Sequence, residues 1–218
     1  MKYKIFSFKE LVDLGHDKRE LTGKLLELVN ITLDDISSDS VGEIDQWLPI
    51  LENIPECCKI IVETKTGKIV GHWFFTAIGE EMYKEAIKGT LMEINMTIDN
   101  VELLDKKGIY YGYFNQIEIL KEHRNPATFK MLIESFFEQV EELSKKEIFF
   151  FRWVTLAASK EGEMISRSLG LQYKTDHVLD GKIYSGNIFT MANLKVLSRY
   201  PQLVEAYSEI YERVIDET

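Results

Sequence analysis

Cysteine is scarce in this sequence: there are two, Cys57 and Cys58, and they are adjacent. Adjacent cysteines rarely bridge each other, and two thiols alone can build neither a disulfide framework nor a zinc site. The four histidines show no metal-ligand spacing. These absences predict reduced thiols, no bound metal and a cytoplasmic location.

Long apolar runs and positive charge are lacking as well. No segment reaches the roughly 18 apolar residues that a membrane span needs. The beginning of the chain, MKYKIFSFKEL, holds no uninterrupted apolar segment of the signal-peptide type. The formal net charge of -10 argues against a nucleic-acid backbone, which would need a basic patch. We therefore expect neither a membrane nor a nucleic acid as partner.

One stretch, residues 110–142, organises the chain. Its first half is rich in aromatic and β-branched residues and predicts a buried strand over 111–120. Its second half carries apolar residues at helical spacing, which predicts a helix over 126–145 with a wide apolar face. Phe136 and Phe137 belong to that face, so we expect both to be buried under the sheet.

The turn between this strand and this helix holds the densest group of basic residues, and it suits one small anion. Asn125 is a good N-cap and Pro126 suits the first helical position, so the helix begins just after Arg124. Helix N-termini attract anions. His123 is expected to be an exposed loop residue. The free backbone N–H groups expected at this helix start belong to Ala127, Thr128 and Phe129.

The rest of the chain predicts one domain, 1–218, with its core over about 40–192. A strand, a crossover helix and a second strand imply a parallel pair, here 111–120 beside 148–154. The fold class is therefore α+β: a mixed, mostly antiparallel sheet of six or seven strands flanked by helices. Before the central unit we expect a strand at 1–7, helices over 9–36, a polar loop at 37–40 and a short helix at 43–48 that Pro49 ends. A hairpin of 59–63 and 68–77, which turns at Gly67, comes next, and an insert over 79–107 begins with a helix at 79–88. After the central unit we expect a helix at 159–168, a second hairpin of 172–179 and 182–191, and a C-terminal helix at 201–215. The segment 90–107 is left open between an inserted strand pair and a cover over the site.

This order, with the turn at Arg124, resembles the GNAT superfamily of acyl-CoA-dependent N-acyltransferases. The family signature reads roughly hydrophobic-x-Pro-x-x-Arg-Gly-x-Gly-x-Gly/Ala, followed by x-x-Leu-Leu. Here Arg124 falls on the arginine, and Leu132-Ile133 falls on the paired aliphatics. The resemblance implies that acetyl-CoA or another acyl-CoA lies in a splayed gap between the parallel strands. It also implies that an amine, on a small molecule or a peptide, attacks the thioester directly.

The motif also departs from the family. Asn125, Ala127 and Phe129 stand where the family has loop glycines that let the backbone approach the CoA pyrophosphate. Phe129 must then turn its ring into the core. In a later motif Ser159 replaces an asparagine, and Ser166 replaces the tyrosine that often protonates the leaving thiolate. Serine is a poor acid at neutral pH, so this position lacks the proton donor that the family often has.

The resemblance assigns roles residue by residue. Glu118 is the candidate general base, directly or through water, and Ser166 stands at the position of the acid. Tyr111 and Tyr113 would line an acceptor pocket. The cofactor-binding set is Ile119, Leu120, Arg124, Asn125, Ala127, Thr128, Phe129 and Ser159.

Each role has an alternative without function. Glu118 would be an ordinary strand carboxylate, Arg124 a solvated loop residue, and the two tyrosines packing residues. For the whole chain, one alternative is a GNAT-fold binding or regulatory protein without catalysis. Another is an unrelated α+β protein with a coincidental loop. A homodimer is left open.

Overall fold

A computed structural model of the chain describes residues 2–32, 42–191 and 197–216. Residues 33–36 of the predicted helix and the predicted loop 37–40 lie outside the described residues. The strands are β1 Tyr3–Ser7, β2 Cys58–Glu63, β3 Ile69–Ile78, β4 Gly108–Ile119, β5 Ile148–Ala157, β6 Gln172–Asp176 and β7 Lys182–Gly186. The helices are α1 Phe8–Asp13, α2 Lys18–Thr32, α3 Ile44–Asn53, α4 Glu80–Lys88, α5 Pro126–Lys145, α6 Lys160–Ser168, α7 Ile188–Met191 and α8 Pro201–Asp216, with short 3-10 turns at Pro55–Cys57, Glu93–Asn95, Lys121–His123 and Leu197–Arg199.

In the described part of the chain, seven strands form one sheet in the order β1-β2-β3-β4-β5-β7-β6. The chain divides into two compact units, and β4 contributes to both. Unit 1 comprises Met1–Thr76, Met92–Leu103 and Phe114–Phe136; unit 2 comprises Ala77–Leu91, Leu104–Tyr113 and Phe137–Thr218. The fold class is the one the sequence predicts: a mixed, mostly antiparallel sheet with helices around it and a helix at its C-terminal end.

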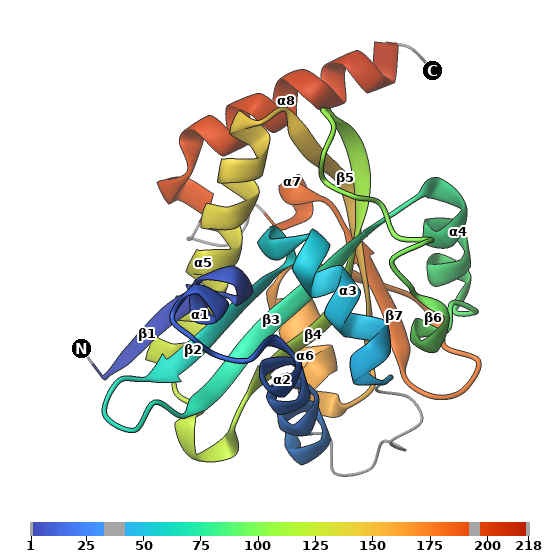
Figure 1. Cartoon of the computed structure of the whole chain (residues 1–218). Coiled ribbons are helices and arrows are strands. Elements are labelled where there is room, and N and C mark those ends of the chain that lie inside the picture. Colours follow the sequence, from blue (N-terminus) through green and yellow to red (C-terminus); the bar gives the residue numbers. More distant parts are fainter. Residues whose placement is uncertain (1, 33–41, 192–196, 217–218) are drawn as a thin grey trace. The chain divides into compact units, whose positions relative to one another are not determined.

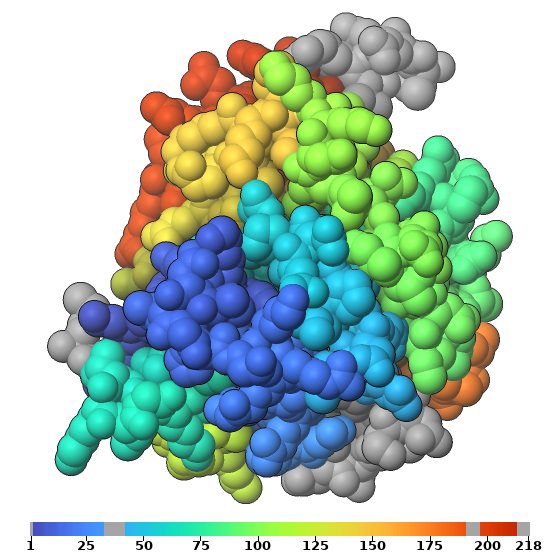
Figure 2. All heavy atoms as spheres, viewed as in Figure 1, coloured from blue at the N-terminus to red at the C-terminus, as the bar shows by residue number. Residues whose placement is uncertain are grey.

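In unit 1, β1 and β3 pair antiparallel with the two sides of β2. The β2–β3 hairpin turns at Gly67, whose φ of 71° is easy only for glycine. The helices α2 and α3 lie across one face of β3 (Figure 1), where the Trp47 ring meets Phe74 edge-on at 5.3 Å. In Figure 2 the atoms of α1, α2 and α3, blue to cyan, cover this face of the unit.

The opposite face of β3 packs on the first half of α5. The Trp73 indole donates a 2.8 Å hydrogen bond to the Ser135 hydroxyl. Phe136 is 1% exposed, and Phe137, which belongs to unit 2, is fully buried. The predicted burial of both phenylalanines is confirmed.

In unit 2, the first half of β4 runs beside β5 in the same direction. The Gly108 N–H donates to the Glu147 carbonyl at 2.9 Å. Further along, the Tyr110 and Tyr111 rings lie 6.2 Å from those of Phe150 and Phe151 respectively. The two strands advance together, which confirms the predicted parallel pair. β7 then pairs antiparallel with both β5 and β6.

Two sequence predictions about elements are wrong. The helix at 43–48 does not end at Pro49, because α3 runs from Ile44 to Asn53 with the proline inside it. Interior proline loses one backbone hydrogen bond and costs about 3 kcal/mol, but the buried side chains of Trp47, Ile50 and Leu51 offset this cost. The predicted strand at 182–191 stops at Gly186, and α7 follows.

The second error has a local cause that involves Asn187. Its side-chain oxygen accepts hydrogen bonds from the N–H groups of Phe189 and Thr190, at 3.0 and 2.9 Å, and so starts a helix. In the segment left open, 90–107, the structure shows turns and one short 3-10 helix and no strand pair.

Candidate functional site

The second half of β4 breaks the usual alternation of side chains. Phe114 packs on the α5 side of the sheet. Asn115 hydrogen-bonds to Thr76 at 3.1 Å, and Gln116 hydrogen-bonds to His72 at 2.9 Å. Thr76 and His72 share one face of β3, because they are four residues apart. The Asn115 and Gln116 side chains therefore both point to that face, opposite to Phe114. Two successive side chains on one face are the mark of a β-bulge. The bulge turns the end of β4 so that its polar residues face α2 and α3.

Glu118 is the next residue on that face. Its carboxyl group accepts a 2.6 Å hydrogen bond from the Thr32 hydroxyl at the end of α2. β3 approaches closely here, since a Cβ on Gly71 would lie 2.6 Å from the Glu118 carbonyl oxygen. Burial raises the pKa of Glu118 from 4.5 to about 7, against smaller opposing effects of the Thr32 hydrogen bond and the Arg124 charge. The side chain is nonetheless partly accessible, so the arrangement suits a general base at neutral pH.

The turn after β4 holds Arg124. Its side chain is exposed, and its Nε donates a 2.8 Å hydrogen bond to the Ile119 carbonyl. The Leu120 N–H is already used, because it donates to the Val70 carbonyl at 2.9 Å. The guanidinium is thereby held at the end of β4 while its far side faces solvent, a suitable position for an anion.

The expectation that the N–H groups at the start of α5 are free is wrong. The Asn125 side-chain oxygen accepts from the N–H groups of Ala127 and Thr128, at 3.0 and 3.1 Å. The Phe129 N–H donates to the Asn125 carbonyl at 3.1 Å. Glycine at this position would have no side-chain acceptor, whereas the side chain of Asn125 accepts hydrogen bonds from the Ala127 and Thr128 N–H groups. An anion can reach the first two donors only if the Asn125 side chain rotates away.

Comparison with known proteins adds the fold to this geometry. No protein-family model and no curated protein matches the sequence. Solved structures do match: an acetyltransferase of the GNAT family from Staphylococcus aureus Mu50 superposes with a TM-score of 0.53, at 11% identity, over 85% of this chain and 99% of that chain. The chain has the GNAT fold. The protein PH1933 of Pyrococcus horikoshii gives a TM-score of 0.53 at 10% identity, over 85% of this chain and 98% of that one. A chain of the NatC complex bound to Gag peptide and CoA gives 0.51 at 11% identity, over 85% and 96%.

The residues that the resemblance to the GNAT superfamily singled out are divided between the two units. Unit 1 brings together Glu118, the turn and the start of α5. Phe129, which was expected to turn into the core, is half-buried. The other four candidates, Tyr111, Tyr113, Ser159 and Ser166, lie in unit 2.

The unit 2 candidates all have structural partners. The Tyr111 ring stacks on Tyr83 at 4.4 Å, and Tyr113 is 1% exposed. Ser159 is the N-cap of α6, where its hydroxyl accepts from the Gly162 N–H at 3.1 Å. Ser166 is buried and donates to the Gly162 carbonyl at 2.8 Å. Their proposed roles in this GNAT fold stay predictions.

One histidine beside the turn was placed wrongly from the sequence. His123 was expected to be exposed, but it is 8% exposed. The Tyr3 hydroxyl lies 3.0 Å from its Nδ1, and the two rings meet edge-on at 5.8 Å. The first strand of the GNAT fold thus covers His123, while Arg124 is exposed to solvent.

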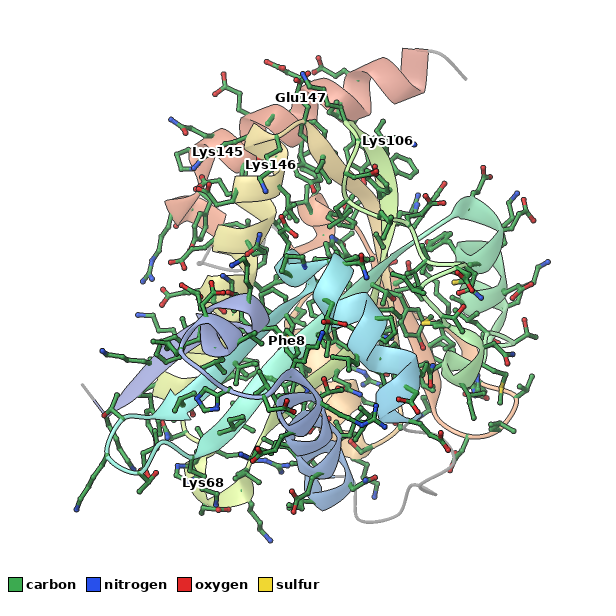
Figure 3. All side chains as sticks on the ribbon, viewed as in Figure 1. Phe8, Lys68, Lys106, Lys145, Lys146 and Glu147 are labelled. Carbon is green, nitrogen blue, oxygen red and sulfur yellow. The ribbon has the colours of Figure 1, made fainter. Side chains whose placement is uncertain are left out.

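Several other charged side chains in the described residues form ion pairs. Figure 3 labels Lys145, Lys146 and Glu147 where α5 passes into β5, with Lys106 in the same region of unit 2. Lys145 pairs with Glu142 at 2.6 Å, and Lys107 pairs with Glu147. Within the ranges that the structure describes, no group of three histidine, cysteine or acidic residues could hold a metal ion, and no helix is long and apolar enough to span a membrane. Cys57 and Cys58 are buried free thiols.

Sequence reasoning missed the partners of Glu118. Thr32 lies 86 residues before it, and nothing in the local sequence links the two residues. The bond between Gln116 and His72 carried no signal either. The bulge that turns both Asn115 and Gln116 to this face depends on strand pairing rather than on local composition.

Proposed function

We propose that the protein is a GNAT-type N-acyltransferase, which transfers an acetyl or other acyl group from acyl-CoA to an amine. The observation that carries the proposal is Glu118: a partly accessible carboxyl group, with a pKa raised to about 7, at the end of the central strand of a GNAT fold. Two further facts support it. One structural neighbour is a GNAT-family acetyltransferase, and another belongs to a complex bound to CoA and a peptide.

In the proposed reaction, the amine nitrogen bonds to the thioester carbon and the carbon–sulfur bond breaks. Glu118 takes the proton from the nitrogen, directly or through water. CoA leaves as a thiolate, and because a thiol has a pKa near 8.5 it needs little help from an acid. The poor acidity of Ser166 is therefore compatible with turnover.

The proposed binding regions follow the same fold. Arg124 and the start of α5 would hold the CoA phosphates, with the remaining cofactor contacts at Ile119, Leu120 and Ser159. Tyr111 and Tyr113 would line the acceptor side. The acceptor is an amine of a small molecule or a peptide.

Calorimetry with acetyl-CoA, followed by an assay of free CoA release over a panel of small amines and peptides, tests the function. We expect binding, and release of CoA with at least one class of acceptor. Absence of acetyl-CoA binding would overturn the proposal that the protein is an acyltransferase. Binding without release by any acceptor would favour a GNAT-fold binding protein, a reading that the capped N–H groups at Asn125 also support.

Removing the guanidinium at the turn should weaken acyl-CoA binding. Arg124→Ala loses charge-assisted hydrogen bonds of about 1.5–3 kcal/mol each, which corresponds to about a tenfold or larger loss of affinity. For a CoA analogue that lacks phosphate groups, the same substitution should reduce the affinity less, because less of its affinity depends on Arg124. Calorimetry on both ligands measures the difference.

Lys65→Ala is the matched control for Arg124→Ala, since it removes one exposed positive charge from the turn between β2 and β3. We expect wild-type affinity from this variant. Strong CoA binding that is indifferent to Arg124 would show that the anion binds elsewhere.

Freeing the capped N–H groups should strengthen CoA binding. Asn125→Gly removes the acceptor that occupies the Ala127 and Thr128 donors, and one hydrogen bond of about 1 kcal/mol corresponds to about fivefold in affinity. Asn125→Asp should act in the opposite direction, because it keeps the cap and repels phosphate. The glycine should cost only a few tenths of a kcal/mol in stability, so calorimetry and a thermal melt together separate binding from folding.

Asn187→Gly is the control for Asn125→Gly, because Asn187 caps α7 in the same manner. It should leave CoA affinity unchanged. Equal affinity in the wild type and both Asn125 variants would show that these N–H groups take no part in binding.

A further inference from the structure

The hydroxyl of Thr32 faces three hydrogen-bond acceptors at the end of α2. Glu118 Oε2 lies 2.6 Å from its oxygen, and the carbonyl oxygens of Leu28 and Val29 lie at 3.0 and 3.1 Å. A hydroxyl carries one proton, so it donates to one of these acceptors at a time and can accept through its lone pairs. Which acceptor receives the proton depends on whether the Glu118 carboxyl group is ionised.

From this geometry we infer that Thr32 is a positioning residue that keeps Glu118 hydrogen-bonded in both protonation states by reversing the direction of their shared bond. When Glu118 is ionised, the Thr32 hydroxyl donates to it. When Glu118 has taken a proton, the carboxyl group donates to the Thr32 oxygen, and the hydroxyl rotates to donate to the carbonyl of Leu28 or Val29. No proton leaves Thr32, and the transferred proton stays on Glu118.

The surroundings of the carboxyl group make this reversal possible. Arg124 is the charged side chain that acts on it, from the turn after β4. The groups that face it from α2 are uncharged: the Thr32 hydroxyl and the carbonyls of the last helical turn, whose dipoles favour the protonated acid. On β4 itself, Gln116 is neutral, and on β3 burial lowers the pKa of its partner His72 to about 4, so this histidine is neutral at about pH 5.5 and above. A partly buried carboxyl group that loses this partner in either state would be left with an incompletely satisfied polar group, which lowers the stability of the folded protein.

This inference rests on the proposed function only in taking Glu118 as the base, and its test does not need turnover. Thr32→Val removes the hydroxyl and keeps the branched shape, while Thr32→Ser keeps the hydroxyl. The carboxyl carbon of Glu118 in isotopically labelled protein is titrated by NMR, and Glu118→Gln identifies its signal. Thermal melts are recorded at about pH 5.5 and about pH 8.5, on either side of the pKa of Glu118.

We expect Thr32→Val to lower the melting temperature by about 2–4 °C at both pH values, because a bond is lost in both states. It should also raise the pKa of Glu118 slightly, since the bond to the ionised form is the stronger of the two. Thr32→Ser should restore both properties. If the enzyme turns over, the acidic limb of its pH profile should move by the same amount.

Thr22→Val is the matched control on the same helix. Its buried hydroxyl donates to the Lys18 carbonyl at 2.8 Å, so its loss should leave the titration of Glu118 unchanged. A melting-temperature loss in Thr32→Val that is confined to the higher pH would overturn the reversal, because the bond would then exist only with the ionised acid. An unchanged melt and titration would overturn any role of Thr32. Absence of turnover alone would count against the proposed function and not against this inference.

Discussion

Replacing Glu118 with glutamine should lower turnover by about 10²–10⁴-fold, the usual contribution of a positioned general base. The amide keeps the size of the side chain and can still bond to Thr32, but it cannot take a proton from the amine. Because the base acts in the chemical step, affinity for acyl-CoA should change little. Initial rates with a saturating amine, together with calorimetry on acetyl-CoA, measure the two effects separately.

Glu122→Gln is the control for this change, because Glu122 is an exposed carboxylate on the same turn, paired with Lys68 at 3.1 Å. It should behave as wild type. Turnover of Glu118→Gln equal to wild type across pH would remove Glu118 from the mechanism and leave deprotonation to solvent.

The same variant should be more stable than wild type at alkaline pH. The pKa of Glu118 in the folded protein lies above the ordinary value of 4.5, at about 7, so the folded state holds this proton more tightly than the unfolded state does. Wild-type stability therefore falls as pH rises from 4.5 through 7, by up to about 3 kcal/mol. Glutamine does not ionise, so the gain should be present near pH 9 and absent near pH 4.5 when the free energies of unfolding are compared.

The central strand, turn and helix could be predicted because their signals are local. Asn125 and Pro126 mark a helix start by their own chemistry, and the apolar spacing that follows fixes the buried face. The predicted start of α5 at residue 126 is confirmed. The parallel pair followed from a general rule about strand–helix–strand units. Neither inference needed knowledge of distant contacts.

The unpredicted features depend on contacts between distant parts of the chain. His123 is buried because Tyr3 covers it. Burial raises the pKa of Glu118, and Thr32, far away in the sequence, donates a hydrogen bond that opposes part of this rise. Pro49 is tolerated inside α3 because the packing of its neighbours outweighs its local cost. Asn125 differs from these residues, because the sequence predicts it as the N-cap of the helix. The prediction did not include the effect of this cap, which occupies the N–H groups expected to bind an anion.

Truncating Phe136 to alanine should destabilise unit 1 by about 3–5 kcal/mol, the cost of emptying a buried aromatic site. Its side chain is 1% exposed. Its ring lies 4.7 Å from that of Phe114 and 5.9 and 6.3 Å from those of Trp73 and Phe75. The variant therefore loses edge-to-face ring contacts in addition to buried area. Each kcal/mol lost from the free energy of unfolding lowers the melting temperature by about 2–4 °C for a chain of this length. The melting temperature of Phe136→Ala should therefore fall by about 10 °C.

Phe129→Ala is the matched control, because it removes the same ring from a half-buried position on the same helix. A half-buried ring leaves a smaller cavity and loses less contact with its neighbours, so this variant should cost clearly less than Phe136→Ala. Phe136→Leu should fall between them, since a smaller apolar side chain refills part of the space. An unchanged melt in Phe136→Ala would mean that α5 does not hold β3 and β4 through this face. The arrangement that places Glu118 at the end of β4 would then need another support.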